Sequence, residues 1–200
     1  MKQRIVTLDM EGVLTPEIWI AVAEQTGIGE LRRTTRDEPD YDKLMRSRIA
    51  ILDQQGIPLS RIQGVIGALA PLPGAADFLN LLRAQVQVII VSDTFEQFAQ
   101  PLLRQLGWPT LFCNRLLVEN DRITGYQLRL PDQKRCAVTA LQSLNYRVIA
   151  AGDSFNDTSM LKQADHGILF RAPEAVVKQF SQFPAVSDYA ALLARITALL

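Results

Sequence analysis

Residues that can carry chemistry occur in four short stretches of the sequence that lie far apart along the chain. They are Asp9, Glu11, Ser92, Asp93, Lys134, Asp153, Asn156 and Asp157. Several carboxylates brought together repel one another unless a cation neutralises them, and Mg²⁺ prefers carboxylate oxygens while it keeps water and phosphate oxygens as further ligands. A lysine beside such a cation would attract a phosphate group. These residue types therefore predict a phosphoryl-transfer site that uses Mg²⁺.

Individual roles follow from the chemistry of each side chain. Asp9, next to a metal ion, can act as a nucleophile and pass through an aspartyl-phosphate. Glu11, two residues on, can protonate a leaving alkoxide and then deprotonate a water molecule. Ser92 and the backbone N–H groups after it can donate hydrogen bonds to phosphoryl oxygens, and Lys134 can balance the charge on the transferring group. Gly12 allows the backbone to approach the phosphate closely.

Apolar runs in the sequence predict how these residues come together. Buried β-strands are expected over residues 4–9, 86–92, 146–153 and 167–170. The first three runs end at Asp9, Ser92 and Asp153. Because ligands of open α/β sheets bind at the carboxyl ends of the strands, we expect these three side chains to face a single crevice.

Helical spacing of apolar residues alternates with these strands. Helices are expected over residues 74–83, 95–106, 133–143, 156–163, 173–180 and 188–200. Strands that alternate with helices are typical of a parallel sheet whose right-handed crossovers place helices on both faces. The sequence therefore predicts an α/β, Rossmann-like fold with a mostly parallel sheet.

Two regions depart from this alternation. Residues 16–70 lack a clear strand, and their helical spacing over 16–26, 41–53 and 59–69 predicts a small helical cap inserted after the first strand. Residues 110–130 hold two strand-like runs separated by Asn120-Asp121, which predicts a β-hairpin. We expect a catalytic core of residues 1–14 and 72–200 that contains the hairpin, and a cap of residues 15–71.

Composition excludes several classes of protein. The chain has 200 residues, 21 Lys+Arg against 21 Asp+Glu, and 48% hydrophobic residues, a balance typical of a globular domain rather than a nucleic-acid binder. The basic stretch 32–36 is interpreted as a solvated helix face. No apolar run is long enough to span a membrane, and two cysteines without a CxxC pattern fit a reducing compartment. We expect a cytoplasmic protein with no nucleic-acid or membrane partner, in which the single histidine, His166, lies in a turn and is structural.

The order of the motifs resembles that of the haloacid dehalogenase superfamily, whose phosphotransferases work through an aspartyl-phosphate. The matching segments are Asp9-Met10-Glu11-Gly12-Val13, Ser92, Lys134 and Gly152-Asp153-Ser154-Phe155-Asn156-Asp157. The resemblance implies that Asp9, Asp153 and the backbone carbonyl of Glu11 hold Mg²⁺, with Asp157 as a further ligand or as a partner of the ligands. It also implies that substrate contacts Ser92, Asp93, Lys134 and Asn156.

A cap inserted after the first motif resembles the phosphoserine phosphatase branch, in which a cap glutamate and a cap arginine grip the amino-acid end of the substrate. Glu17 and Arg48 occupy those places. A free amino acid is a zwitterion, so its pocket needs an anion for the ammonium and a forked cation for the carboxylate. The implied substrate is L-phosphoserine. An ion pair within the cap, or two surface charges, is the alternative interpretation of these residues.

Three features differ from ordinary phosphoserine phosphatases. Glu11 stands where aspartate is usual, Asp93 stands where glycine is usual, and the spacing from Asp9 to Glu17 is one residue shorter. These features resemble bacterial bifunctional enzymes that combine phosphoserine phosphatase and homoserine phosphotransferase activities. That resemblance implies that L-homoserine can replace water as the phosphoryl acceptor. The sequence does not set the oligomeric state, and a homodimer is compatible with it.

Other functions stay open at this point. One is a phosphatase of the same family that acts on another small phosphomonoester. A signalling receiver domain also combines an acidic cluster, a hydroxyl and a lysine around a phosphorylated aspartate, but receivers are shorter and lack a helical insert. A C–halogen hydrolase on the same fold would use Asp9, yet it would need neither Glu11 nor the Asp153 and Asp157 pair.

Overall fold

The computed structural model describes residues 2–34, 37–38 and 40–200. Its strands are β1 (Gln3–Leu8), β2 (Gln87–Phe95), β3 (Thr110–Glu119), β4 (Arg122–Gln127), β5 (Tyr146–Gly152), β6 (His166–Phe170) and β7 (Ala185–Val186). Its α-helices are α1 (Ile18–Thr26), α2 (Tyr41–Gln54), α3 (Leu59–Gly67), α4 (Ala75–Arg83), α5 (Glu96–Gln105), α6 (Gln133–Ser143), α7 (Thr158–Gln163), α8 (Glu174–Gln179) and α9 (Tyr189–Thr197). Two 3₁₀ segments are η1 (Gly29–Arg32) and η2 (Phe155–Asp157).

The strands form one sheet in the order β4-β3-β2-β1-β5-β6-β7, in which only the β3–β4 pair is antiparallel. The predicted α/β, mostly parallel fold is therefore confirmed. Strand β1 lies at the centre, and its residue Leu8 is in register with Ile90 of β2 and Ala151 of β5. Asp9 follows Leu8 directly, so the register brings Asp9 beside the segments that carry Ser92 and Asp153.

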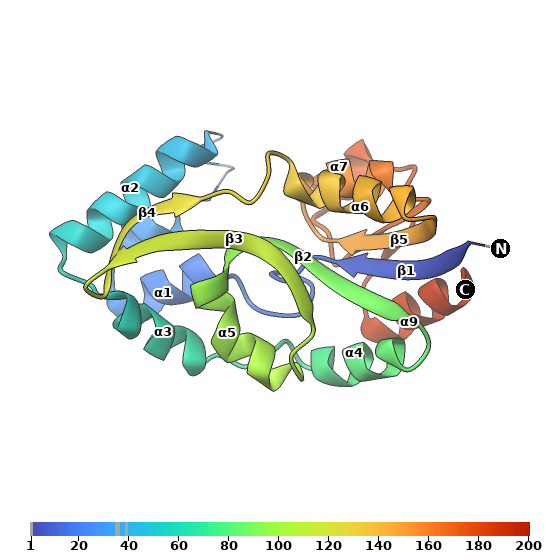
Figure 1. The fold of residues 1–200 in the computed structure, drawn as a ribbon, viewed down its shortest axis with the longest axis horizontal. Coiled ribbons are helices and arrows are strands. Elements are labelled where there is room, and N and C mark those ends of the chain that lie inside the picture. The colour runs from blue at the N-terminus through green and yellow to red at the C-terminus, as the bar shows by residue number, and fades with distance from the viewer. Residues whose placement is uncertain (1, 35–36, 39) are drawn as a thin grey trace.

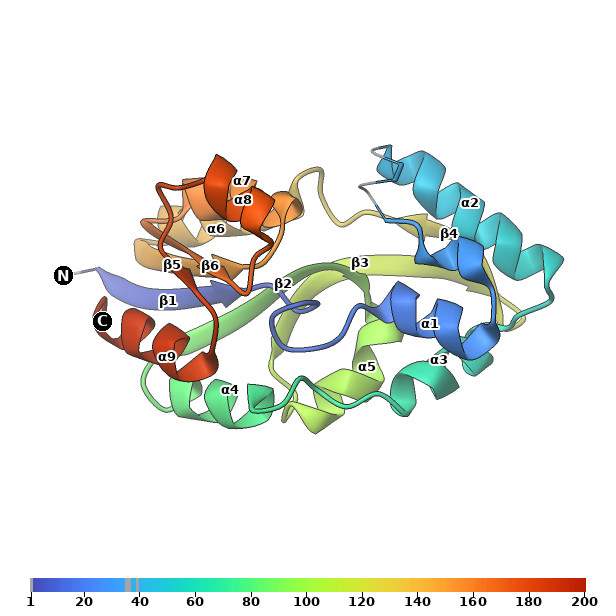
Figure 2. The same ribbon diagram turned by 180° about the vertical axis from the view of Figure 1, so that it is seen from behind.

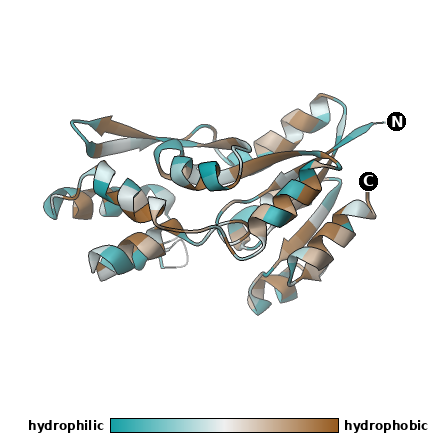
Figure 3. Ribbon diagram, turned by 90° about the horizontal axis from the view of Figure 1, so that it is seen from below, coloured by the Kyte–Doolittle hydropathy of each residue, from teal (hydrophilic) through white to brown (hydrophobic). Residues whose placement is uncertain are grey.

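Alternation of side chains along the strands builds a core on each face of the sheet. In β5, Ile149 and Ala151 belong to a core that α4, α5 and α9 also supply, whereas Val148 and Ala150 belong to a core supplied by α6, α7 and α8. These two sets of helices lie on opposite sides of the sheet in Figure 1. In Figure 3 the strands are largely brown and the helices carry both colours, as expected for buried strands and half-buried helices.

Helices α1, α2 and α3 gather at the end of the molecule opposite the chain termini (Figures 1 and 2). The β3–β4 hairpin extends to the same end and contacts these helices. The Tyr126 hydroxyl donates to Asp42 Oδ1 at 2.7 Å, and the backbone N–H of Leu59 donates to the Asp121 carbonyl at 2.7 Å. The hairpin therefore supports the helices that follow β1, while its first strand remains part of the central sheet.

A few elements differ from the expectations. Strand β2 runs on to Phe95, so Ser92 lies inside the strand, where the pairing with β3 shifts register. His166 is the first residue of β6 and pairs in register with Ile149, so its assignment to a turn was wrong. In the basic stretch 32–36, Arg32 ends η1 and is ion-paired with Glu24, and residues 35 and 36 lie outside the described ranges. None of the described helices combines the length and apolar character needed to cross a membrane.

Candidate active site

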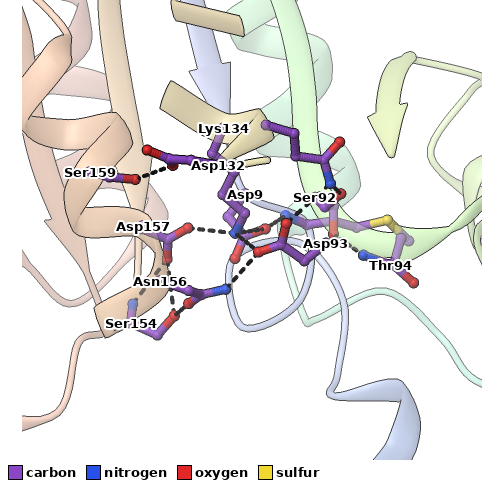
Figure 4. A network of polar contacts seen from close by, with 12 residues as sticks. Asp9, Ser92, Asp93, Thr94, Asp132, Lys134, Ser154, Asn156, Asp157 and Ser159 are labelled. Atoms are coloured by element: carbon purple, nitrogen blue, oxygen red, sulfur yellow. Dashed lines mark hydrogen bonds and ion pairs between the residues drawn. The ribbon is translucent and has the colours of Figure 1, made fainter. Parts of the chain in front are cut away.

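The ammonium group of Lys134 lies among carboxylates at the centre of the site (Figure 4). Its Nζ is 2.7 Å from Asp157 Oδ1, 2.9 Å from Asp9 Oδ1 and 3.8 Å from Asp93 Oδ2. Lys134 is the second residue of α6, and only 2% of its side chain is exposed. Burial alone would lower the pKa of Lys134, but the surrounding carboxylates raise it well above its ordinary value. The lysine therefore stays charged and partly neutralises the acidic cluster.

Asp9 follows β1 directly and is almost completely buried. Its Oδ1 accepts hydrogen bonds from the Met10 backbone N–H at 2.7 Å and from Lys134. Both of these contacts use Oδ1, so within the described part of the chain Oδ2 is the oxygen left available for chemistry. Burial and repulsion from Asp157 raise the pKa of Asp9 well above its usual range, although Lys134 opposes the shift.

Asp157 is fully buried, and hydrogen bonds use both of its carboxylate oxygens. Oδ2 accepts from the backbone N–H of Asp153 at 2.9 Å and of Ser154 at 3.0 Å, while Oδ1 accepts from Lys134. A Cβ on Gly152 would lie 2.4 Å from Asp157 Cγ, so a side chain at position 152 would displace this carboxylate. The glycine before the acidic loop is therefore needed for the loop to close over Asp157.

Asp153 faces Asp9 across the site. A Cβ on Gly12 would lie 2.5 Å from Asp153 Oδ2, and Gly12 has a φ of +77°, which favours glycine. Burial and repulsion from Asp157 raise the pKa of Asp153 to about 7. Oxygens of Asp9, Asp153 and Asp157 all lie within 4.8 Å of one another. Three clustered carboxylates with one lysine between them are a donor set that suits a divalent cation such as Mg²⁺.

A hydrogen-bond network joins β2 to α6 and η2. Asp93 accepts from Gln133 Nε2 through Oδ1 and from Asn156 Nδ2 through Oδ2, each at 3.1 Å. Gln133 Nε2 also donates to the Ser92 carbonyl at 2.8 Å. The unusual acidic residue after Ser92 thus holds together two segments that flank the acidic cluster, as Figure 4 shows for Asp93 and Asn156.

Glu11 lies between the acidic cluster and the helices that follow β1. Its Oε2 accepts from the backbone N–H of Ile18 at 2.9 Å. Burial, followed by repulsion from Glu17, raises the pKa of Glu11 to about 7. A carboxyl group with such a pKa can give up or take a proton near neutral pH.

Glu17 and Arg48 approach the same space from α1 and α2. Glu17 is exposed and precedes the first residue of α1, whereas Arg48 in α2 is 6% exposed. Burial lowers the pKa of Arg48 to about 10, so it remains a cation at neutral pH. In the described part of the chain, the contacts that hold the guanidinium involve a backbone carbonyl, a thioether and an aromatic ring rather than a carboxylate. An ion pair between Glu17 and Arg48 is therefore absent.

One cavity of about 230 Å³ collects these side chains. Nine of the ten predicted site residues line it, and Asp157 lies behind Lys134 and Asp153. The lining also contains Ser154 and Phe155 of the last motif, to which no role was assigned, and residues that the sequence did not single out, namely Trp19, Ile20, Thr34, Tyr41, Leu44 and Thr94. Tyr41 and Leu44 precede Arg48 by seven and four residues, so helical spacing from Arg48 was a signal that could have identified them.

The sequence of this chain is similar to those of known enzymes. A family model described as haloacid dehalogenase-like hydrolase matches residues 3–165. The chain is 60% identical over 186 residues to Phosphoserine phosphatase ThrH of Pseudomonas aeruginosa, which covers 92% of this chain and 91% of that protein. It is equally similar to a phosphoserine phosphatase of Pseudomonas syringae pv. tomato, with 92% and 78% covered.

Solved structures show the same fold. A phospho-aspartyl intermediate analogue of phosphoserine phosphatase superposes with a TM-score of 0.78 at 20% identity and covers 98% of this chain and 99% of that one. A substrate-bound phosphoserine phosphatase complex superposes with a TM-score of 0.76 at 20% identity, covering 94% and 95%. The family-model match and the 60% identity to Phosphoserine phosphatase ThrH, together with the acidic cluster at the ends of β1 and β5, show that the chain is an enzyme of the haloacid dehalogenase-like hydrolase family.

Proposed function

We propose that the protein hydrolyses L-phosphoserine through a phosphorylated Asp9. The observation that carries this proposal is the position of Asp9: Lys134 and a backbone N–H hold one carboxylate oxygen, and among the described residues the other is left available in the cavity. A single cavity also holds an acid with a pKa of about 7 and a buried arginine without a carboxylate partner among the described residues. The similarity to two phosphoserine phosphatases supports the choice of substrate.

The reaction has two steps in this proposal. Asp9 Oδ2 attacks phosphorus, the bond between phosphorus and the serine oxygen breaks, and Glu11 donates its proton to that oxygen. Glu11 then accepts a proton from a water molecule whose oxygen attacks phosphorus, and the bond to Asp9 breaks to release inorganic phosphate. Lys134 balances negative charge on the transferring group, and Ser92 and Asn156 offer polar groups to it.

A metal ion fits the donor set described above. Asp9, Asp153 and the Glu11 backbone carbonyl would hold Mg²⁺, and Asp157, whose oxygens already accept hydrogen bonds, would orient its neighbours. When bound, Mg²⁺ would supply positive charge beside the phosphoryl group. The raised pKa values of Asp9 and Asp153 support this assignment, because their carboxylates are buried and repelled by Asp157, and a cation would favour their charged forms.

Substrate selection rests on the cap side of the pocket. Arg48 would pair with the substrate carboxylate and Glu17 with its ammonium. The same two groups would bind L-homoserine, whose hydroxyl would take the place of water in the second step and yield phosphohomoserine. Glu11 and Asp93, the residues that differ from ordinary phosphoserine phosphatases, lie in this cavity and support the second acceptor. Helices α1–α3 would act as a lid that keeps bulk water from the intermediate.

Replacing Arg48 tests the substrate. Arg48→Ala removes the cation for the substrate carboxylate, so KM for phosphoserine should rise roughly 10- to 100-fold, the range expected for a hydrogen bond to a charged group. KM for p-nitrophenyl phosphate should stay nearly constant, because that ester has no carboxylate. Steady-state phosphate release with Mg²⁺ measures both. Arg46→Ala, in the same helix but exposed, is the matched control. Equal losses on the two esters would make Arg48 structural, and a wild-type enzyme without preference for phosphoserine would refute the substrate.

Removal of the metal should make stability depend on pH. The pKa values of Asp9 and Asp153 are raised on folding, so the metal-free folded state binds more protons than the unfolded state above about pH 4, and its stability falls as the pH rises to about 7. Thermal unfolding in a chelator should therefore give a lower Tm at pH 8 than at pH 5.5. Mg²⁺ should raise the Tm more at pH 8, because metal binding releases protons.

The variant Asp153→Asn sharpens that measurement. Because it removes one of the repelling carboxylates, the metal-free variant should have a higher Tm than the wild type at pH 8 and a weaker response to Mg²⁺. A metal-free Tm that rises from pH 5.5 to pH 8, or a variant that responds fully to Mg²⁺, would contradict the assignment of the metal site.

The acceptor is tested by product analysis. With phosphoserine, Mg²⁺ and increasing L-homoserine, ³¹P NMR should show phosphohomoserine growing at the expense of inorganic phosphate. 1-Propanol, which has a hydroxyl but neither charged group, should yield no phosphate ester at the same concentrations. In Arg48→Ala, the rate of transfer to homoserine should fall more than the rate of hydrolysis. Inorganic phosphate as the sole product at every homoserine concentration would leave a plain phosphatase.

A further inference from the structure

Among the residues that the structure describes, buried Arg48 lacks the carboxylate partner that a buried guanidinium usually has. Its Nη2 donates to the Arg33 carbonyl at 2.6 Å, and its Nη1 lies 3.7 Å from Met45 Sδ. Within residues 2–34, 37–38 and 40–200, its Nε has no hydrogen-bond partner. An arginine has five N–H donors in one plane, so these contacts leave donors unused beside the cavity. Something other than an ion pair must fix the plane in which those donors lie.

Trp19 supplies that support. The guanidinium carbon of Arg48 lies 4.5 Å from the centroid of the Trp19 ring, a distance at which an aromatic face attracts a cation. Such stacking uses the flat face of the guanidinium and keeps the N–H groups at its edge free for a carboxylate. Trp19 lies in the first turn of α1, two residues after Glu17, so it connects the two groups proposed to grip the substrate.

The Trp19 ring is itself fixed by the aromatic core beneath it. Trp19 meets Phe98 of α5 edge to face, with ring centroids 5.3 Å apart, and Phe98 meets Phe95 in the same way at 5.7 Å. Phe95 and Phe98 are essentially fully buried, and Phe95 ends β2, the strand that carries Ser92. A continuous chain of side-chain contacts therefore runs from Phe95, at the end of the strand that carries Ser92, to the guanidinium of Arg48.

We infer that Trp19 is a positioning residue that holds the Arg48 guanidinium in the plane needed to bind a substrate carboxylate, and that it thereby sets the preference for phosphate esters of α-amino acids. This inference rests on the proposed function, because it assigns a carboxylate to Arg48. An aliphatic side chain such as leucine would keep an apolar contact but would offer no π-face, so the guanidinium would lose its support. Trp19 touches no reacting atom, so its loss should weaken ground-state binding and spare the chemical steps.

The experiment is a double-mutant cycle read on two substrates. Trp19→Leu, Trp19→Phe, Arg48→Ala and the double variant Trp19→Leu/Arg48→Ala are compared by kcat and KM for phosphoserine and for p-nitrophenyl phosphate. Trp19→Leu should raise KM for phosphoserine roughly tenfold with kcat within about twofold, and should leave KM for p-nitrophenyl phosphate within about twofold. Trp19→Phe, which keeps an aromatic face, should restore most of the affinity.

The cycle separates positioning from packing. In the Arg48→Ala background, Trp19→Leu should change KM for phosphoserine by less than about twofold, because the group that Trp19 supports is gone. Trp108→Leu is the matched control, since the other tryptophan is 61% exposed and lies outside the cavity, and it should change neither substrate. Circular dichroism and thermal unfolding establish that each variant is folded before kinetics are compared.

Each failure has its own signature. Equal losses on the two esters, or losses by Trp19→Leu and Arg48→Ala that multiply in the double variant, would overturn the inference and make Trp19 a packing residue. A Trp19→Phe enzyme as impaired as Trp19→Leu would overturn it too, and this milder variant provides the test if Trp19→Leu fails to fold. A wild-type enzyme that does not prefer phosphoserine would instead refute the proposed function.

Discussion

The contact of the Lys134 ammonium with the carboxylates of Asp9 and Asp157 governs the arrangement of the site. Lys134 is brought there by the start of α6, Asp9 by the end of β1 and Asp157 by the loop after β5. None of these charges could be buried alone, because an isolated ion in the interior costs several kcal/mol or more. Each element is therefore held in position partly by the charge that the other two carry.

The balance of charge in this cluster is incomplete. One ammonium faces the carboxylates of Asp9, Asp153 and Asp157, and burial, followed by repulsion from Asp157, raises the pKa values of Asp9 and Asp153. Such a cluster suits a divalent cation and a phosphoryl group that binds beside it. The proposed nucleophile is thus part of the electrostatic arrangement that would hold the metal.

In the proposed function, the helices after β1 would contribute a different kind of selectivity. The acidic cluster would suit phosphate esters in general, whereas Glu17 and Arg48 would suit the zwitterionic end of an amino acid. The β3–β4 hairpin contacts α2 through Tyr126 and α3 through Asp121. Helices α2 and α3 are therefore tied to the sheet, and packed structure sets the distance between Arg48 and the acidic cluster.

Much of this arrangement could be predicted from the sequence, because parallel strands place their carboxyl ends at one edge. Asp9 and Asp153 follow apolar runs, so local patterns were enough to bring them together. The same patterns did not predict that β2 continues past Ser92, because the register shift depends on pairing with β3. Gln133 was missed because an amide at a helix start has no distinctive signal, and its role depends on where Ser92 and Asp93 lie in space.

Trp19 was missed for a related reason. Its aromatic side chain fits the apolar pattern of a helix, and only the fold brings both Phe98 and Arg48 into contact with it. The hairpin was predicted from its turn residues, but its contacts with α2 and α3 join segments about sixty to eighty residues apart. Local patterns carry no information about contacts of that range.

The most direct test of the account is to look for phosphate on Asp9 during turnover. The enzyme is mixed with phosphoserine and Mg²⁺, quenched in acid within a single turnover, and digested for mass spectrometry. We expect one phosphoryl group on the wild-type peptide that contains Asp9. In Asp9→Asn, that peptide should carry no phosphoryl group, and the variant should release no phosphate. Undiminished turnover by Asp9→Asn, or a phosphoryl group carried by another residue, would contradict the account.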